Sequence, residues 1–139
     1  MEYRKKGDNY IVRIDKNEEV VEQLTILCKH ENIKAGSITG LGAAKYIKVG
    51  LFDTEKKEYN SKEYSGPMEI TSLIGNISRK DGEVYLHLHI NLCDETMQVF
   101  GGHLNECVIG ATCELVLTSI DLDISRRFNE EIGLNLLEF

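Results

Sequence analysis

The sequence of 139 residues lacks several features that define whole classes of protein. No apolar run approaches the roughly 20 residues that a membrane-spanning helix needs. The N-terminal charges Arg4, Lys5 and Lys6 are not followed by an apolar stretch, so the start of the chain does not resemble a signal peptide. There is one proline, and there is no low-complexity segment, repeat or linker. We therefore expect a cytoplasmic protein with no membrane association, folded as a single domain over residues 1–139.

Cysteine is present, but not in the spacing of a redox or zinc-ribbon motif. None of the four cysteines forms a C-x-x-C pair, which excludes thioredoxin-like and zinc-ribbon sites. Cys28 and Cys113 lie within apolar patterns, so we interpret them as small core residues. Because no secretion signal is visible, a disulfide framework is not expected.

Positive charge is scarce and scattered. The chain has 16 Lys and Arg against 23 Asp and Glu, which gives a net charge of −7 at pH 7. The basic residues occur as short groups with acids nearby, namely Arg4–Lys6, Lys56–Lys57, Arg79–Lys80 and Arg126–Arg127. We interpret these groups as solvated turns and strand ends. Non-specific DNA affinity needs clustered Lys and Arg, so we do not expect the isolated chain to bind DNA directly.

One segment has the periodicity of a helix. From residue 18 to about residue 32 the apolar side chains recur at helical spacing. These side chains are Val20, Val21, Leu24, Leu27 and Cys28. Asp15 or Asn17 is expected to cap the start of this helix. His30 lies at its C-terminal end, where a cation suits the helix dipole, and we do not interpret it as a ligand.

Most of the remaining chain has the pattern of short strands separated by turns. Arg79–Gly82 is expected to be a hairpin turn, in which Gly82 supplies a positive φ. Gly40-Leu41-Gly42 is expected to be a glycine turn, and the tail 124–139 is expected to pack back on the sheet. Residues 37–42 are expected to form a short strand that ends in this glycine turn. Further strands are expected at residues 11–14, 44–52, 58–64, 68–78, 84–92, 97–100 and 107–118. Successive hairpins predict an α/β fold of the α+β kind, with a mostly antiparallel sheet and one main helix on one face.

The strand expected at residues 84–92 carries the most informative side chains. Its apolar residues alternate with polar ones, so His87 and His89 at positions i and i+2 point to the same face. Their Cα atoms are about 7 Å apart, a span that two imidazoles can close around one ion. His103 follows one turn and one short strand later. If its strand is antiparallel and adjacent to the strand of His87 and His89, the chain returns to the level of these two histidines along the sheet. We therefore expect these three histidines to converge.

Three neutral imidazoles suit one Zn²⁺ ion, although Ni²⁺, Cu²⁺ and Fe²⁺ also bind such a set. The alternative is three polar side chains on a solvated sheet face. Three of the four histidines of the chain fall in one hairpin, which favours the metal site. We predict one divalent metal ion per chain, zinc by preference, held by His87, His89 and His103.

The residues around this hairpin leave several roles open. Glu114 falls in a strand expected near the histidines. It is a fourth ligand, a general base, a residue that orients a ligand, or an acid at the edge of the core. Gly101 and Gly102 allow the backbone to approach a ligand or a neighbouring chain closely, or they form a bulge. Glu69 is a weaker candidate of the same kind as Glu114.

Several motifs together resemble the PPC domain, named for plants and prokaryotes conserved. The pair H-x-H and G-G-H is the most specific part, and the likeness covers nearly the whole chain. The motifs are Gly36–Gly42 (GSITGLG), Leu86–His89 (LHLH), Gly101–Leu104 (GGHL), Cys113–Leu115 (CEL) and the closing stretch Arg126–Leu137 (RRFNEEIGLNLL).

The resemblance implies a mostly antiparallel α/β fold, assembly as a homotrimer, and metal bound by His87, His89 and His103. Prokaryotic members are labelled as DNA-binding because the plant domain is fused to AT-hooks, and this chain has no AT-hook. Two functions follow as hypotheses. One is a metal-binding trimeric module that acts in regulation or in assembly with protein partners. The other is a zinc-dependent enzyme or small-ligand sensor that uses the open fourth position of a three-histidine site.

Overall fold

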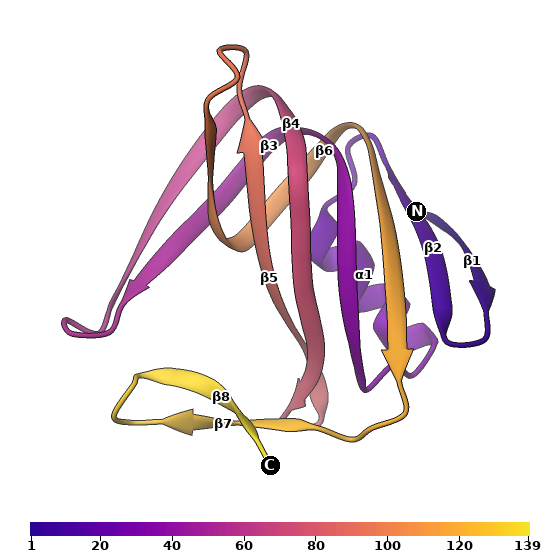
Figure 1. Ribbon diagram of the computed structural model, residues 1–139, viewed down its shortest axis with the longest axis vertical. Coiled ribbons are helices and arrows are strands. Elements are labelled where there is room, and N and C mark those ends of the chain that lie inside the picture. The colour runs from indigo at the N-terminus through magenta and orange to yellow at the C-terminus, as the bar shows by residue number, and fades with distance from the viewer.

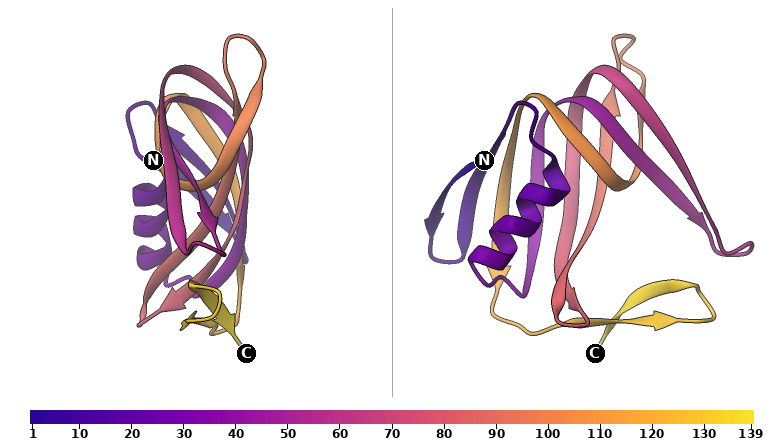
Figure 2. Two further views of the ribbon diagram at one scale, coloured as in Figure 1. Left: turned by 90° about the vertical axis from the view of Figure 1, so that its left-hand side faces the viewer. Right: turned by 180° about the vertical axis from the view of Figure 1, so that it is seen from behind.

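The computed structural model describes residues 1–139 and contains one helix and eight strands. Helix α1 lies against one face of a large bent sheet, and the other face carries no helix (Figure 2). The expected α+β composition is therefore confirmed. In chain order the elements are β1 (Glu2–Lys6), β2 (Asn9–Asp15), α1 (Val20–His30), β3 (Ala35–Asp53), β4 (Glu58–Lys80), β5 (Glu83–Cys93), β6 (Val99–Ile120), β7 (Ser125–Asn129) and β8 (Leu134–Glu138).

All strands belong to one sheet, in the order β1-β2-β6-β3-β4-β7-β8, with β5 paired to both β4 and β6. Because β3 also pairs with both β4 and β6, these four strands close into a ring. The pairings are antiparallel except for one parallel bridge between β4 and β7, at Arg79 and Ser125. The expected mainly antiparallel sheet is confirmed, and so is the Arg79–Gly82 turn, where Gly82 has a φ of 82°.

Helix α1 begins and is capped differently from the sequence prediction. Its cap is Glu19, whose side chain accepts hydrogen bonds from two backbone N–H groups of the first turn. Asn17 has a φ of 73° and lies in a turn, while Asp15 forms an ion pair with Arg13. The Glu19 carboxylate also accepts a hydrogen bond of 2.9 Å from the backbone N–H of Cys107. A single side chain therefore joins the helix start to β6, a long-range contact that local sequence does not reveal.

Three strands are much longer than the sequence pattern predicts. Strands β3, β4 and β6 each merge two expected strands, and β1 was not expected. The glycine turn predicted at Gly40–Gly42 is wrong, because this segment lies inside β3 at a shift in the β3–β4 register. A Cβ at Gly42 would lie 2.3 Å from the carbonyl oxygen of Thr112, so glycine here permits close strand approach. Figure 1 shows the result, a long β3–β4 hairpin arm that bends over. Strand β3 ends at Asp53 and β4 begins at Glu58, so the tip of the arm lies between these residues.

The two faces of the sheet differ in what covers them. The apolar residues of α1 pack with those of the sheet into one core of 25 buried residues. All four cysteines are buried and unpaired, as expected for Cys28 and Cys113. On the other face, neighbouring strands align a row of cross-strand partners. From β2 to β5 this row is Ile11, Val116, Thr39, Ile74 and His89, and its three aliphatic residues are 44–61% exposed.

The C-terminal tail forms the β7–β8 hairpin, which runs below the β3–β4 arm (Figure 1). Its one strand pairing with the rest of the sheet is the bridge between Arg79 and Ser125. Side-chain hydrogen bonds from Arg126 to Ser78 and Asn76 also join it to β4, so the tail packs on this end of the sheet as predicted. At the tips, the Lys57 ammonium donates a hydrogen bond of 2.6 Å to the carbonyl oxygen of Glu130. The arm and the tail therefore frame a space between them. No helix of the structure is both long enough and apolar enough to cross a membrane.

Candidate metal and ligand site

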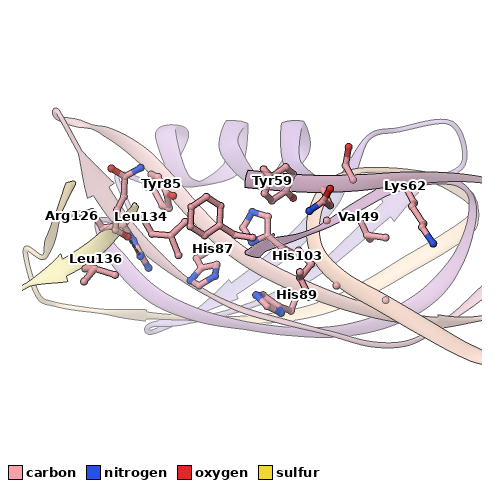
Figure 3. Close-up of a pocket in the computed structure, with 18 of the residues that line it drawn as sticks. Val49, Tyr59, Lys62, Tyr85, His87, His89, His103, Arg126, Leu134 and Leu136 are labelled. Carbon is pink, nitrogen blue, oxygen red and sulfur yellow. Dashed lines mark hydrogen bonds between the residues drawn. The ribbon is translucent and has the colours of Figure 1, made fainter. Parts of the chain in front are cut away.

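The structure brings His87, His89 and His103 together, as their spacing predicts. His87 and His89 lie on β5 and share a face, and His103 lies on β6 directly opposite His89 in the antiparallel register. Their ring centroids are 5.2–5.6 Å apart. One ring nitrogen from each histidine lies within 4.8 Å of the others. Figure 3 shows the three rings pointing toward one another.

The electrostatics of the cluster favour neutral imidazoles. Partial burial lowers the pKa of His87 below its ordinary value, and the positive charge of Arg126 and the other two histidines lower it further. Burial also lowers the pKa of His103, with a contribution from His89. A neutral imidazole has a free ring nitrogen for a metal ion, whereas an imidazolium has none. Both shifts therefore prepare these side chains for ligation near neutral pH.

The three histidines line a cavity of about 880 Å³. The floor comes from β5 and the start of β6, one wall from the β3–β4 arm, and another from the β7–β8 hairpin. Tyr59 of the arm approaches the edge of the His103 ring, with centroids 6.2 Å apart. Tyr59 is held there by a hydrogen bond of 2.6 Å from its hydroxyl to Asn105. The cavity is within the size range of small-molecule sites.

Arg126 of β7 lies at one end of this cavity, beside Tyr85 (Figure 3). Its guanidinium donates hydrogen bonds to the Ser78 hydroxyl, the Asn76 side-chain oxygen and the Asn135 carbonyl oxygen, at 2.8, 2.8 and 2.9 Å. It also lies over the Tyr85 ring, 4.8 Å from the centroid. The interpretation of Arg126 as a solvated strand-end residue is therefore wrong, because only 9% of it is exposed.

The other candidate residues are placed unequally. Gly101 and Gly102 line the cavity. Glu114 does not line it. Glu114 is exposed, and its strand partners are Arg13 on β2 and Leu41 on β3, far along β6 from His103. The bend of β6 takes the chain away from the histidines, so the structure does not place Glu114 where a fourth ligand or a base would stand.

Glu69 is also exposed and does not line the cavity. It lies on β4 opposite Cys93 of β5, beyond the register shift that separates it from the histidine-bearing part of the pairing. The structure therefore gives no support to a role of Glu69 as a ligand or a base at the histidine site either.

The family model of the Plants and Prokaryotes Conserved (PCC) domain, also written PPC, matches residues 1–121. The chain belongs to this family. Solved structures that are 34–38% identical to the chain match it over nearly their whole length and nearly the whole of this chain. No curated protein matches the chain.

Three of these PCC-like structures bear on the site. A protein from Bacteroides thetaiotaomicron, described as a putative DNA-binding protein, is 37% identical with a TM-score of 0.97, covering 99% of this chain and 96% of that one. A PPC protein from Pyrococcus horikoshii is 38% identical with a TM-score of 0.87, covering 96% and 92%. A protein from Archaeoglobus fulgidus, described as metal-containing, is 34% identical with a TM-score of 0.88, covering 99% and 97%.

Sequence reasoning missed the residues that complete the cavity of this PCC domain. Tyr59 was expected only as part of an exposed strand, Tyr85 only as part of the histidine-bearing strand, and Arg126 only as part of a basic pair. The match to the family model ends at residue 121, yet Arg126 and Leu134–Leu136 line the cavity. The only sequence signal for this segment was the family-like motif Arg126–Leu137, which did not assign a role to any single residue.

Proposed function

We propose that the protein is a metal-binding PCC-domain protein in which His87, His89 and His103 hold one divalent ion, zinc by preference. The observation that carries the proposal is the convergence of three imidazole nitrogens from two paired strands in one cavity. The relative from Archaeoglobus fulgidus, described as metal-containing, supports it. The donor set supports it too, because three neutral imidazoles are a common set of ligands for catalytic zinc.

The geometry fits an ion after a small closure of the rings. Two nitrogens bound to one tetrahedral Zn²⁺ at about 2.05 Å are roughly 3.4 Å apart. The histidine nitrogens lie within 4.8 Å of one another. Rotation about the side-chain torsions suffices to close this gap. The only ring hydrogen bond of a histidine in the structure is that of His30, so the three clustered rings are free to turn.

Three protein ligands leave a coordination position that opens toward the cavity. A zinc ion held there would act as a Lewis acid and would lower the pKa of a bound water to about 7. The large cavity beside the open position favours a site that receives a small molecule over a purely structural ion. The leading role is therefore a regulatory module whose metal centre senses a ligand. The second candidate is a zinc-dependent enzyme built on the same centre.

We also propose a homotrimer, which the family resemblance implies. The uncovered sheet face supports it, because Ile11, Val116 and Ile74 form an exposed aliphatic row that a partner subunit would cover. This row ends at His89, so assembly on this face would place the partner beside the metal site. A relative is described as DNA-binding. We assign any such role of this chain to complexes with other proteins, for reasons of charge given below.

Elemental analysis of protein purified without a histidine tag tests the metal site. We expect about one zinc-like ion per chain. His89→Ala should remove the ion, and His30→Ala is the matched control, since His30 lies at the exposed end of α1 beside Tyr3 and Glu31. Full occupancy in the double variant His87→Ala/His89→Ala would refute the site.

A further inference from the structure

We propose that Arg126 is an anion-binding residue and that the cavity receives a small organic carboxylate, with its charged group at Arg126 and its body toward the histidines. This goes beyond the metal site, because the anion site consists of the protein's own charges and needs no ion. The inference starts from a buried charge without a counterion. Arg126 is 9% exposed, and no carboxylate lies within ion-pair distance of it.

A buried charge without an opposite charge is costly, so proteins rarely keep one without a reason. Here the guanidinium is held by three neutral acceptors, from Ser78, Asn76 and Asn135. These bonds satisfy three of its five N–H donors and fix the plane of the fork. The Tyr85 ring supports one face of that plane. The guanidinium is therefore fixed in orientation, but its positive charge is not balanced by a carboxylate. An arginine in this state is suited to bind a planar anion.

The charge of the cavity agrees with this reading. The protein has 23 Asp and Glu, but none of the 19 residues that line the cavity is acidic. Two of them, Arg126 and Lys62, are cationic, and three are the clustered histidines. A concave surface with one sign of charge concentrates ligands of the opposite sign. In a protein of net charge −7, a cavity without a carboxylate is selective for anions.

The remaining lining favours an organic anion over an inorganic one. Apolar and aromatic side chains of the arm and the tail face the same space; they include Val49, Leu51, Phe52, Tyr64, Leu134 and Leu136. Contact between these side chains and the hydrocarbon body of a ligand would bury apolar surface and strengthen binding. Inorganic phosphate has no apolar surface and would not gain this affinity. The ligand class is thus a small molecule with one carboxylate and an apolar body.

Benzoate tests the proposal, with benzamide as the neutral probe of the same shape. Binding is measured by calorimetry and by NMR shift changes, on both zinc-loaded and chelator-treated protein. We expect benzoate to bind at least tenfold more tightly than benzamide, because a charge-assisted bidentate pair forms only with the anion. Binding of benzoate to the metal-free protein separates this proposal from the zinc site, which can fail independently.

Arg126→Gln should weaken the binding of benzoate at least tenfold. Arg126→Lys should restore only part of the affinity, because lysine keeps the charge but lacks the planar guanidinium. Arg127→Gln is the matched control, since the neighbouring Arg127 is exposed and pairs with Glu138. Thermal unfolding shows whether each variant is folded. If Arg126→Gln does not fold, the comparison of benzoate with benzamide on the wild-type protein still decides. Equal binding of the two probes, or tighter binding of inorganic phosphate than of benzoate, would overturn the proposal.

Discussion

At the scale of single residues, the protonation of His87 decides when the site can hold a metal. Burial is the main cause of its lowered pKa, and the charge of Arg126 is the next. Protons and metal compete for the same ring nitrogen, so a lowered pKa extends metal binding to more acidic pH. Arg126 therefore affects the protonation of His87 in addition to its proposed role in binding an anion.

This coupling can be measured by NMR titration of the histidines in metal-free protein. We expect the pKa of His87 to lie below 6.5, its ordinary value, and to rise in Arg126→Gln because a nearby positive charge is removed. The rise should be partial, since burial remains. Arg127→Gln should leave the titration unchanged. A His87 pKa at or above its ordinary value in the wild-type protein would contradict the electrostatic account.

The same comparison shows how far residue-level prediction reaches. The shared face of His87 and His89 follows from the alternation of a strand, which is a local property. The burial of Arg126 does not, because its acceptors Ser78 and Asn76 are 48 and 50 residues away in the chain. Glu114 lies outside the cavity for a related reason. Its distance from the histidines depends on the bend of β6.

At the scale of elements, the pairing of β5 with β6 sets the position of His103 opposite His89. Gly101 allows the close approach of β5 to β6, and Gly102 allows that of β3 to β6. A Cβ at Gly101 would lie 2.0 Å from the carbonyl oxygen of Ile90, and one at Gly102 would lie 2.8 Å from that of Gly50. Both contacts are with backbone, which cannot turn aside as a side chain can.

Gly101→Ala should therefore push β6 away from β5, destabilise the fold and weaken metal binding together. Overpacking of this kind costs roughly 1–3 kcal/mol, which corresponds to a fall in Tm of several degrees for a chain of this size. Gly110→Ala is the control, because its Cβ would meet its nearest neighbour, Ala44, at 3.2 Å. Calorimetric unfolding and zinc titration measure both effects. An unchanged Tm and zinc affinity in Gly101→Ala would refute this role of the glycine.

The long strands show which strand boundaries could not be predicted from the sequence. Gly66 and Pro67 are typical of a break between two strands, yet both lie inside β4. The register to β3 shifts here, between the partners Ala44 and Tyr46, so the proline occupies a bulge where no ladder donor is needed. Composition alone does not distinguish such a bulge from a turn. The mostly antiparallel direction of the strands was nevertheless predicted, because hairpin turns such as Asp81-Gly82 are local signals.

At the scale of the whole molecule, the exposed aliphatic row leads to a test of assembly. We expect light scattering to give three times the chain mass at micromolar concentration. Ile74→Asp should shift the protein toward monomer, since a buried charge at an interface without a counterion is strongly unfavourable. Ile26→Asp is the control, because Ile26 is similarly exposed but lies on α1, on the opposite face of the sheet. A monomeric wild-type protein would refute the trimer.

Charge at the molecular scale bears on the DNA-binding description of a relative. Two of the basic pairs noted in the sequence, Arg79–Lys80 and Arg126–Arg127, have their side chains engaged. Arg79 donates to the carbonyl oxygen of Ile33, and Lys80 pairs with Asp81. Arg127 pairs with Glu138, and Arg126 is buried in the cavity. None of these four side chains is a free cation on an open surface, so a trimer would not gather them into a basic patch.

We therefore predict that the isolated protein does not bind duplex DNA appreciably at physiological salt. Each phosphate that a protein neutralises releases counterions, so a direct binder needs a positive face and shows steep salt dependence. This chain has 23 acids against 16 bases, and the buried Arg126 faces a cavity and not an open surface. Fluorescence anisotropy with a labelled duplex at about 150 mM salt measures the affinity, and non-specific binders there have a Kd of roughly 10⁻⁴ to 10⁻⁶ M. Sub-micromolar binding that weakens steeply as salt is added would overturn this prediction and make direct DNA binding the leading function.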